Sequence, residues 1–268
     1  MIQIAGRPFD ETALMGEFAQ DSVERQVWSK MAQSSETYRF DSVAQLRFEL
    51  TLRREIVNAA RALDRSAFAF AVFHYSKCNP KYWKRTGNGG FELLGDAKPS
   101  EAIRDIYTNG HLYATECATA MVIVYYKALL EVFGDELFDA TFPKITLMNW
   151  HGLPPLLREV GIPRPAKDVL LGDRGYFDNP DVDPETPQWQ GENVIVLPDD
   201  LYYGHGIGIR TAEEIIRALN SNRFEGATQS AEFLDSLARP NFKRLFEVSS
   251  RGASTPAVLD WTDFPSAV

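Results

Sequence analysis

Residues 110–126 read Gly110-His-Leu-Tyr-Ala-Thr-Glu-Cys-Ala-Thr-Ala-Met-Val-Ile-Val-Tyr-Tyr126. A helix is expected to end before this stretch, at Asn109-Gly110, and a long apolar helix to run from Cys117 to about Phe133 with Thr115 as its N-cap. The N-terminal end of a helix favours thiolate, the reactive form of cysteine. The stretch therefore predicts that Cys117 is a catalytic nucleophile. The alternative is a buried small hydrophobic residue, a common environment of free cysteine.

The composition is that of an ordinary globular protein, with 44% hydrophobic and 24% charged residues over 268 positions. A formal net charge of −9 argues against a nucleic-acid-binding role. Two cysteines, Cys78 and Cys117, are too few for a disulfide scaffold or a zinc cluster, so we expect a reduced, intracellular setting. The N-terminus does not resemble a secretory signal, and no segment has the roughly 20 apolar residues of a membrane span. We expect neither nucleic acid nor membrane as a partner.

The first half of the chain is predicted to be mainly helical. Ser42 and Gln45 resemble a capping box that opens an amphipathic helix over about 42–63. The charged residues of that helix are expected largely on its exposed side: Arg47, Glu49, Arg53, Arg54 and Glu55. Residues 68–74 form an apolar run typical of a buried strand. The further expected elements are a short strand at 2–5, a hairpin of 82–86 with 91–94 around Gly87-Asn-Gly-Gly90, and a helix from Pro99 to about Tyr107.

The second half is predicted to be mainly extended. Strands are expected at 145–150 and 169–171, together with a hairpin of 193–197 and 201–203, a helix from Thr211 to about Asn220, and one or two helices within 229–246. This order predicts an α+β fold in one domain, residues 1–248. Residues 249–268 are turn-rich and are expected to form a loosely held C-terminal extension.

A nucleophilic Cys117 needs a proton acceptor, and three residues are candidates. His205 lies near a predicted strand end, as a papain-like arrangement requires, but it could equally be a turn residue among glycines. Glu192 opens an apolar strand, where burial would raise its pKa and let it share a proton with the thiol. Glu116 is adjacent to Cys117, although an acidic residue there also favours the helix end.

Two further patterns resemble ligand-binding motifs but do not match them. Residues 178–185, Asp-Asn-Pro-Asp-Val-Asp-Pro-Glu, lack the central glycine of a calcium loop and are interpreted as a rigid acidic turn. The glycines of 204–208 do not match the dinucleotide fingerprint. Trp150 and Trp189 stand near predicted strand ends, either as core residues or as walls of an apolar passage to the thiol.

An ordered series of motifs resembles the protein-glutamine gamma-glutamyltransferases of spore-forming bacilli, the small spore-coat transglutaminases. The matching motifs, which extend over about residues 1–247, are Phe48-Glu-Leu-x-Leu-Arg53 with Ile56-Val57, Ser100-x-Ala-Ile-Arg-Asp-Ile106, Glu116-Cys-Ala-Thr-Ala-x-Val-Ile123 with Tyr125-Tyr126, Leu171-Gly-Asp173 with Tyr176-Phe177, Gln188-Trp-x-Gly-Glu-Asn-Val-Ile195, and His205-Gly-x-Gly-Ile209. Residues 151–168 and the last ~20 residues depart from the family pattern, and terminal extensions of this kind are often loosely held.

The resemblance implies a papain-like core like that of cell-wall endopeptidases, with the nucleophile at the start of a buried helix packed on an antiparallel sheet. It implies that Cys117 is the nucleophile and that Glu192 and Glu116 are partly redundant acid/base partners. It also implies a substrate tunnel lined by Trp150 and Trp189, with His205 as a further wall. No cofactor, metal or calcium is implied.

The predicted activity is calcium-independent crosslinking of protein glutamine and lysine side chains through a Cys117 thioester. The expected partners are spore-coat proteins that bear reactive Gln and Lys, and the expected location is the mother-cell cytoplasm and the spore coat. One alternative is a papain-like cysteine peptidase or amidase that uses His205 as its base. The other is a non-catalytic coat protein.

Overall fold

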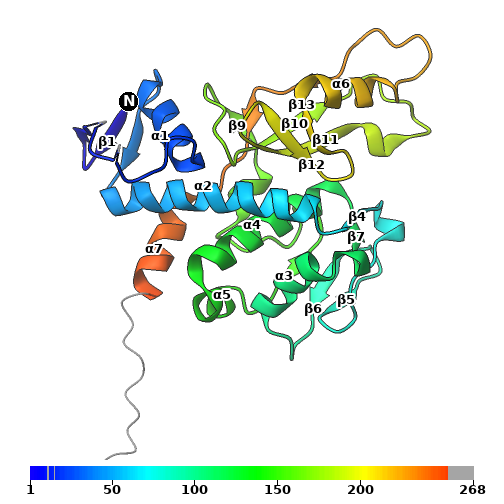
Figure 1. Ribbon diagram of the computed structural model, residues 1–268. Helices are drawn as coiled ribbons and strands as arrows, with labels where there is room; N and C mark the ends of the chain where they lie inside the picture. The colour runs from blue at the N-terminus through cyan, green and yellow to red at the C-terminus, as the bar shows by residue number, and fades with distance from the viewer. Residues whose placement is uncertain (11, 15, 253–268) are drawn as a thin grey trace, which may run out of the picture.

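The computed structural model describes residues 1–10, 12–14 and 16–252, and within them one long helix, α2, crosses the middle of the molecule (Figure 1). The α-helices of this part are α1 (Val23–Gln33), α2 (Val43–Asp64), α3 (Pro99–Thr108), α4 (Cys117–Phe133), α5 (Asp135–Thr141), α6 (Ala212–Asn220) and α7 (Phe242–Gly252). Short 3-10 helices are η1 (Phe73–Tyr75), η2 (Gly110–Leu112), η3 (Arg158–Gly161) and η4 (Pro187–Trp189).

The main sheet is antiparallel, with the strand order β13-β12-β11-β10-β14. Its strands are β10 (Arg174–Asp178), β11 (Gly191–Val196), β12 (Leu201–Gly204), β13 (Gly208–Thr211) and β14 (Glu232–Phe233). The small sheets are β2-β1-β3 (Arg7–Pro8, Ile2–Ile4, Tyr38–Phe40), β5-β6-β8 (Trp83–Arg85, Phe91–Leu93, Thr146–Leu147), the parallel pair β4-β7 (Ala69–Phe70, Ala114–Thr115) and the antiparallel pair β15-β9 (Ser236–Leu237, Arg164–Pro165).

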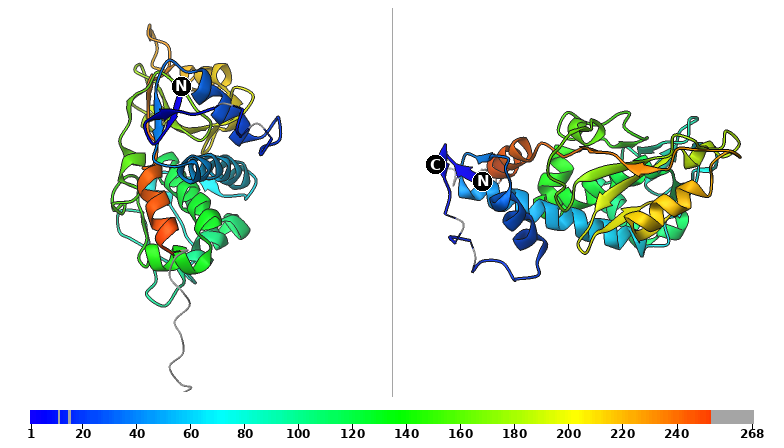
Figure 2. Two further views of the ribbon diagram at one scale, coloured as in Figure 1. Left: turned by 90° about the vertical axis from the view of Figure 1, so that its left-hand side faces the viewer. Right: turned by 90° about the horizontal axis from the view of Figure 1, so that it is seen from above.

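The main sheet lies between two helices because its central strand is apolar on both faces. Successive residues of β11 point to opposite faces. Ile195 joins the large core that α4 fills, whereas Val194 joins a second cluster with Ile215 and Leu219 of α6. Figure 2 shows α6 lying over the outer side of the sheet. A strand that is buried on both faces is a rigid place from which to present side chains at its end.

Helix α4 is buried almost all round, as its apolar sequence predicts. It begins at Cys117 and ends at Phe133, where Gly134 adopts a positive φ of 73°. The predicted N-cap was wrong by one residue. Thr115 belongs to β7, and Glu116 caps the helix by accepting hydrogen bonds from the backbone of its first turn. A carboxylate can do this because the first N–H groups of a helix have no partner within it.

Helix α2 begins where the sequence predicted, with the Ser42 hydroxyl accepting the Gln45 N–H. The expectation that its charged residues lie largely on the exposed side was wrong for two of them. Arg53 is 1% exposed and donates to Glu49 and to Asp173. Helical periodicity could not reveal this, because Asp173 is 120 residues away in the chain. Charged side chains are tolerated in the core when they are paired and hydrogen-bonded in this way.

Several short segments differ from their prediction. The apolar run 68–74 forms a strand only at Ala69–Phe70, which is exposed, and residues 169–171 form no strand. The expected strand at 145–150 shrinks to Thr146–Leu147. The region expected to be helical before α7 contains the short strands β14 and β15 and no helix. Such two-residue strands depend on distant partners and carry little local signal.

Helix α7 continues through residues 249–252, the first residues of the predicted extension. This helix packs on α2, with the Phe246 ring 5.7 Å from the Phe48 ring. Residues 253–268 lie outside the described part of the chain.

The α+β fold class is confirmed, with Cys117 at the start of a buried helix against an antiparallel sheet. Both predicted hairpins form, and Thr211 and Glu214 make a full capping box at the start of α6. Among the described residues, no helix has the length and apolar character needed to cross a bilayer.

Candidate active site

Cys117 lies where the start of α4 meets β11. Its Sγ accepts a hydrogen bond from Asn193 Nδ2 at 3.4 Å. Asn193 is 8% exposed and belongs to the strand buried on both faces. The fold therefore brings together a helix start and a strand that are 76 residues apart in the chain.

Glu116 is held by the helix that it caps. Its carboxylate accepts the backbone N–H groups of Ala118 at 2.6 Å and Thr119 at 2.7 Å, and it also accepts the Thr119 hydroxyl. N–H groups at the start of a helix are potential donors to an oxyanion, but Glu116 occupies these two. A carboxylate with three such bonds is fixed in place and is less free to exchange protons with a substrate.

Glu192 is in the opposite situation. It is 5% exposed, and its Oε1 has no hydrogen-bond partner among the described residues. Burial raises its pKa well above the usual value, as predicted. The hydrogen bond that the carboxylate accepts from the His205 backbone N–H partly offsets that effect, whereas the nearby Glu116 carboxylate adds to it. A buried carboxyl group with a free oxygen is available to exchange a proton.

The thiol of Cys117 and the Glu192 carboxyl group influence each other. Burial raises the pKa of Cys117, and the nearby carboxylates of Glu192 and Glu116 raise it further, while the Asn193 hydrogen bond lowers it. The expected preference for thiolate at the helix end is therefore wrong for the resting site. Two acids that interact in this way titrate as a pair, because one negative charge disfavours the second.

A cavity of about 290 Å³ opens onto Glu192. Its lining is mainly apolar and comprises Phe70, Gln188, Trp189, Glu192, His205, Gly206 and Ile207. Of the predicted tunnel residues, Trp189 and His205 lie here. Trp150 does not line this cavity; its ring lies over the Arg174 guanidinium, 4.5 Å from ring centroid to Cζ.

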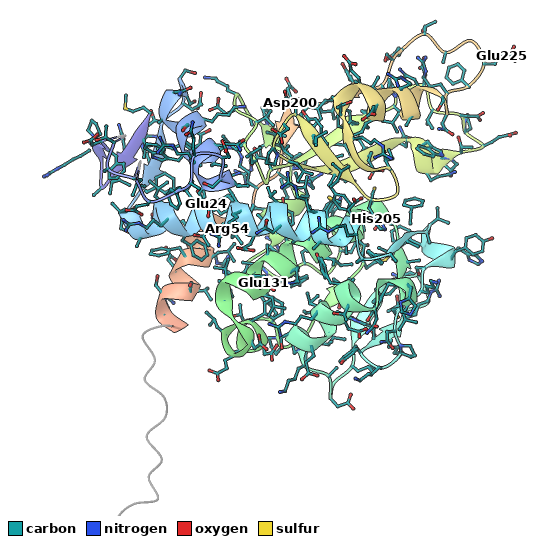
Figure 3. The ribbon with its side chains drawn as sticks, viewed as in Figure 1. Glu24, Arg54, Glu131, Asp200, His205 and Glu225 are labelled. Atoms are coloured by element: carbon teal, nitrogen blue, oxygen red, sulfur yellow. The ribbon has the colours of Figure 1, made fainter. Side chains whose placement is uncertain are left out.

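His205 is engaged on both sides of its ring. Its Nε2 lies 3.0 Å from the Ala69 carbonyl oxygen, and its Nδ1 lies 3.2 Å from the Tyr203 hydroxyl. The ring stacks on Phe68, and burial lowers its pKa to about 4. Figure 3 shows His205 beside the C-terminal end of α2. This neutral, anchored imidazole is poorly placed to act as the base of Cys117.

Two residues of the site were missed from the sequence. Asn193 Oδ1 accepts a hydrogen bond from Arg174 Nη1 at 2.7 Å, so an arginine, an amide and the thiol lie in series. Asn193 is adjacent to Glu192 in a predicted strand, which was a usable signal. Arg174 gave none, because strand β10 was not predicted at all.

The described residues contain no group of three or more His, Cys, Asp or Glu side chains arranged to hold a metal ion. The acidic turn of residues 178–185 is tied to a distant segment of the chain through Asp181. Asp181 Oδ2 accepts the N–H groups of Thr228 and Gln229, both at 2.7 Å.

Comparison with known proteins decides the family. The model of the protein-glutamine gamma-glutamyltransferase family matches residues 1–249. The chain belongs to this family. A relative from Halalkalibacterium halodurans, named protein-glutamine gamma-glutamyltransferase, is 44% identical over 89% of this chain and 82% of its own length. One from Bacillus cereus with the same name is 42% identical over 94% of this chain and 90% of its own.

A solved structure supports the same conclusion. The transglutaminase from Geobacillus stearothermophilus, described as lacking its C-terminal extension, superposes with a TM-score of 0.73. It is 48% identical and covers 77% of this chain and 98% of its own. Family membership confirms the predicted resemblance and makes the chain an enzyme of the transglutaminase class.

Proposed function

We propose that Cys117 and Glu192 carry out acyl transfer between protein glutamine and lysine side chains. The observation that carries this proposal is a buried carboxyl group with a free oxygen, close enough to the thiol to raise its pKa and open to an apolar cavity. Family membership supports the reaction class.

In the first step, Glu192 takes the proton of the Cys117 thiol as sulfur attacks the carboxamide carbon of a glutamine side chain. A C–S bond forms, the C–N bond breaks, and Glu192 returns the proton to the leaving nitrogen. Ammonia departs and a thioester remains. A raised carboxyl pKa suits this exchange, because a group that must both accept and donate works best with a pKa near the operating pH.

In the second step, a neutral lysine amine attacks the thioester carbonyl carbon. Glu192 takes a proton from the amine nitrogen and passes it to the departing sulfur, so the thiol is restored and an isopeptide bond is formed. Water would instead hydrolyse the thioester and leave glutamate. The apolar side chains of Phe70, Trp189 and Ile207 around the cavity disfavour water there.

The asparagine beside Glu192 supplies a donor for the oxyanion of each step. Asn193 Nδ2 already faces Sγ, whereas the first-turn N–H groups of α4 are taken by Glu116. We assign Glu116 mainly to capping the helix and, as a secondary role, to acid/base exchange.

Amine incorporation tests this function. Cys117→Ala should abolish incorporation of a labelled primary amine into a glutamine-bearing protein, and wild-type enzyme incubated with that protein alone should carry an acyl group on the Cys117 peptide that hydroxylamine removes. Retained incorporation by Cys117→Ala would refute the assignment, and an absent adduct would refute the thioester.

Three further features are proposed from the resemblance: activity without calcium, substrates in the spore coat, and a catalytic domain of residues 1–248 followed by an extension. The occupied carboxylate of Asp181 supports the first, and the family match over 1–249 supports the third. Because α7 ends at Gly252, truncation after that residue should preserve activity. Loss of activity in EDTA would contradict activity without calcium. Absence of the enzyme from coat extracts of the source organism would contradict substrates in the spore coat. Inactivity of that truncation would contradict the proposed catalytic domain.

A further inference from the structure

Arg174 is a buried arginine beside the active site with an unusual set of partners. It is 4% exposed, and no carboxylate of the described residues lies within 4.0 Å of its guanidinium. The other deeply buried arginine, Arg53, pairs with both Glu49 and Asp173. A buried charge without a counter-ion is costly, so its retention requires an explanation.

The partners of Arg174 fix its orientation. Nε donates to the Val160 carbonyl oxygen at 2.9 Å, Nη1 donates to Asn193 Oδ1, and the Trp150 ring covers the guanidinium. Three different segments therefore hold it: η3, β11 and the loop after β8. A cation over an indole face is attracted by the ring quadrupole, and that attraction grows when water is excluded.

The arginine decides which way the Asn193 amide points. A guanidinium has donors and no acceptor, so the amide oxygen must face Arg174 and the NH₂ group must face Cys117 Sγ. Hydrogen bonds to a charged donor are stronger than neutral ones, and a polarised amide is a better donor to an anion. Arg174 thereby favours negative charge on Cys117 Sγ indirectly, because it orients and polarises the Asn193 amide that donates to the sulfur.

The titratable groups around this series are few. Glu192 from β11, Glu116 at the start of α4 and Tyr176 from β10 face the thiol. Tyr125 from α4 also lies close enough to Arg174 to interact with it electrostatically. The carboxylates oppose a negative sulfur, and Arg174 is the cation placed to favour it.

We propose that Arg174 is a positioning residue which, held by Trp150, orients the Asn193 amide to stabilise negative charge on Cys117 sulfur. This inference rests on the proposed role of Cys117 as the nucleophile. It gives Trp150 the role of holding the Arg174 guanidinium in place. Neither Arg174 nor Trp150 needs to touch the substrate.

The test is the pH profile of Cys117 alkylation by iodoacetamide, followed by peptide mass so that Cys78 is read separately. Arg174→Met removes the charge and the donors at similar volume. Asn193→Asp keeps a partner for Arg174 but presents only acceptors to sulfur. Arg210→Met is the control, because its exposed guanidinium contacts only the neighbouring Ile209 carbonyl oxygen among the bonds described.

Arg174→Met and Asn193→Asp should each move the profile to higher pH by about one unit, which is about tenfold slower alkylation on its rising part. Trp150→Leu should move it in the same direction by less, and Arg210→Met not at all. In turnover, Arg174→Met should lower kcat more than it raises KM. Circular dichroism checks that each variant folds, and Arg174→Lys, expected to shift the profile less, replaces Arg174→Met if that variant does not.

An unchanged alkylation profile in both Arg174→Met and Asn193→Asp would overturn the proposal, even if activity fell. The contacts of Arg174 with Asn193 would then stabilise only the fold. A shift in Asn193→Asp alone would also overturn it, since the amide would then need no arginine. Failure of the proposed function is separate: it would appear as amine incorporation by Cys117→Ala, whatever the alkylation profile.

Discussion

Gly204 of β12 lies directly beside the Glu192 side chain. A Cβ added at Gly204 would stand 2.8 Å from Glu192 Cγ and 3.0 Å from its Oε1. The absence of a side chain on one strand thus makes room for the buried carboxyl group of the next. Gly204 has an ordinary backbone conformation, since its φ is not in the left-handed region, so space alone explains the glycine.

Gly204→Ala should therefore displace the Glu192 carboxyl group without touching Cys117. A misplacement of about 1 Å at a reacting group can lower the rate by about 100-fold, so we expect a 10- to 100-fold fall in kcat for amine incorporation. Gly87→Ala is the matched control, because nothing lies within 4 Å of its added Cβ. Wild-type kcat in Gly204→Ala would show that the position of Glu192 is not critical.

Glu116→Ala should mainly affect stability. Loss of a helix N-cap costs about 1 kcal/mol, which corresponds to about 2–4 °C in Tm for a domain of this size. The loss of kcat should be smaller than in Glu192→Gln, because the Glu116 carboxylate is held by the backbone. A wild-type Tm combined with abolished activity would instead make Glu116 the principal acid/base group.

His205 should make stability depend on pH below neutrality. Its folded pKa is lowered from 6.5 to about 4, so between those values the unfolded chain binds more protons than the folded chain. Stability should thus be complete above pH 6.5 and fall as the pH drops toward 4, by about 3 kcal/mol at most. Thermal unfolding of wild type and His205→Gln across this window measures the effect, and an equally steep fall in the variant would exclude His205 as its source.

The sequence predicted those parts of the molecule whose signals are local. The α4 helix, the capping box of α6 and the two hairpins follow from runs, caps and turns within a few residues. Cys117 and Glu192 could be selected for the same reason, since each stands at the start of a strongly apolar element. Family resemblance then separated Glu192 from the equally plausible His205.

What the sequence could not predict depends on distant partners. Arg53 looked exposed because helical periodicity cannot include Asp173, and strand β10 was missed together with Arg174. The state of the thiol was also misjudged. A helix end favours thiolate, but the burial and the two carboxylates that oppose it exist only in the folded chain.

The pH dependence of amine incorporation by wild type, Glu192→Gln and His205→Gln distinguishes a carboxylate partner of Cys117 from an imidazole partner. If the Cys117–Glu192 pair performs the chemistry, wild-type kcat should rise with pH as the pair loses its first proton, at a pH above the ordinary carboxyl range because the pKa of Glu192 is raised. Glu192→Gln should lose about 100-fold or more and lack that rise, as expected for a missing general acid/base. His205→Gln should keep the rise. Wild-type activity in Glu192→Gln, with activity abolished in His205→Gln, would contradict the carboxylate mechanism.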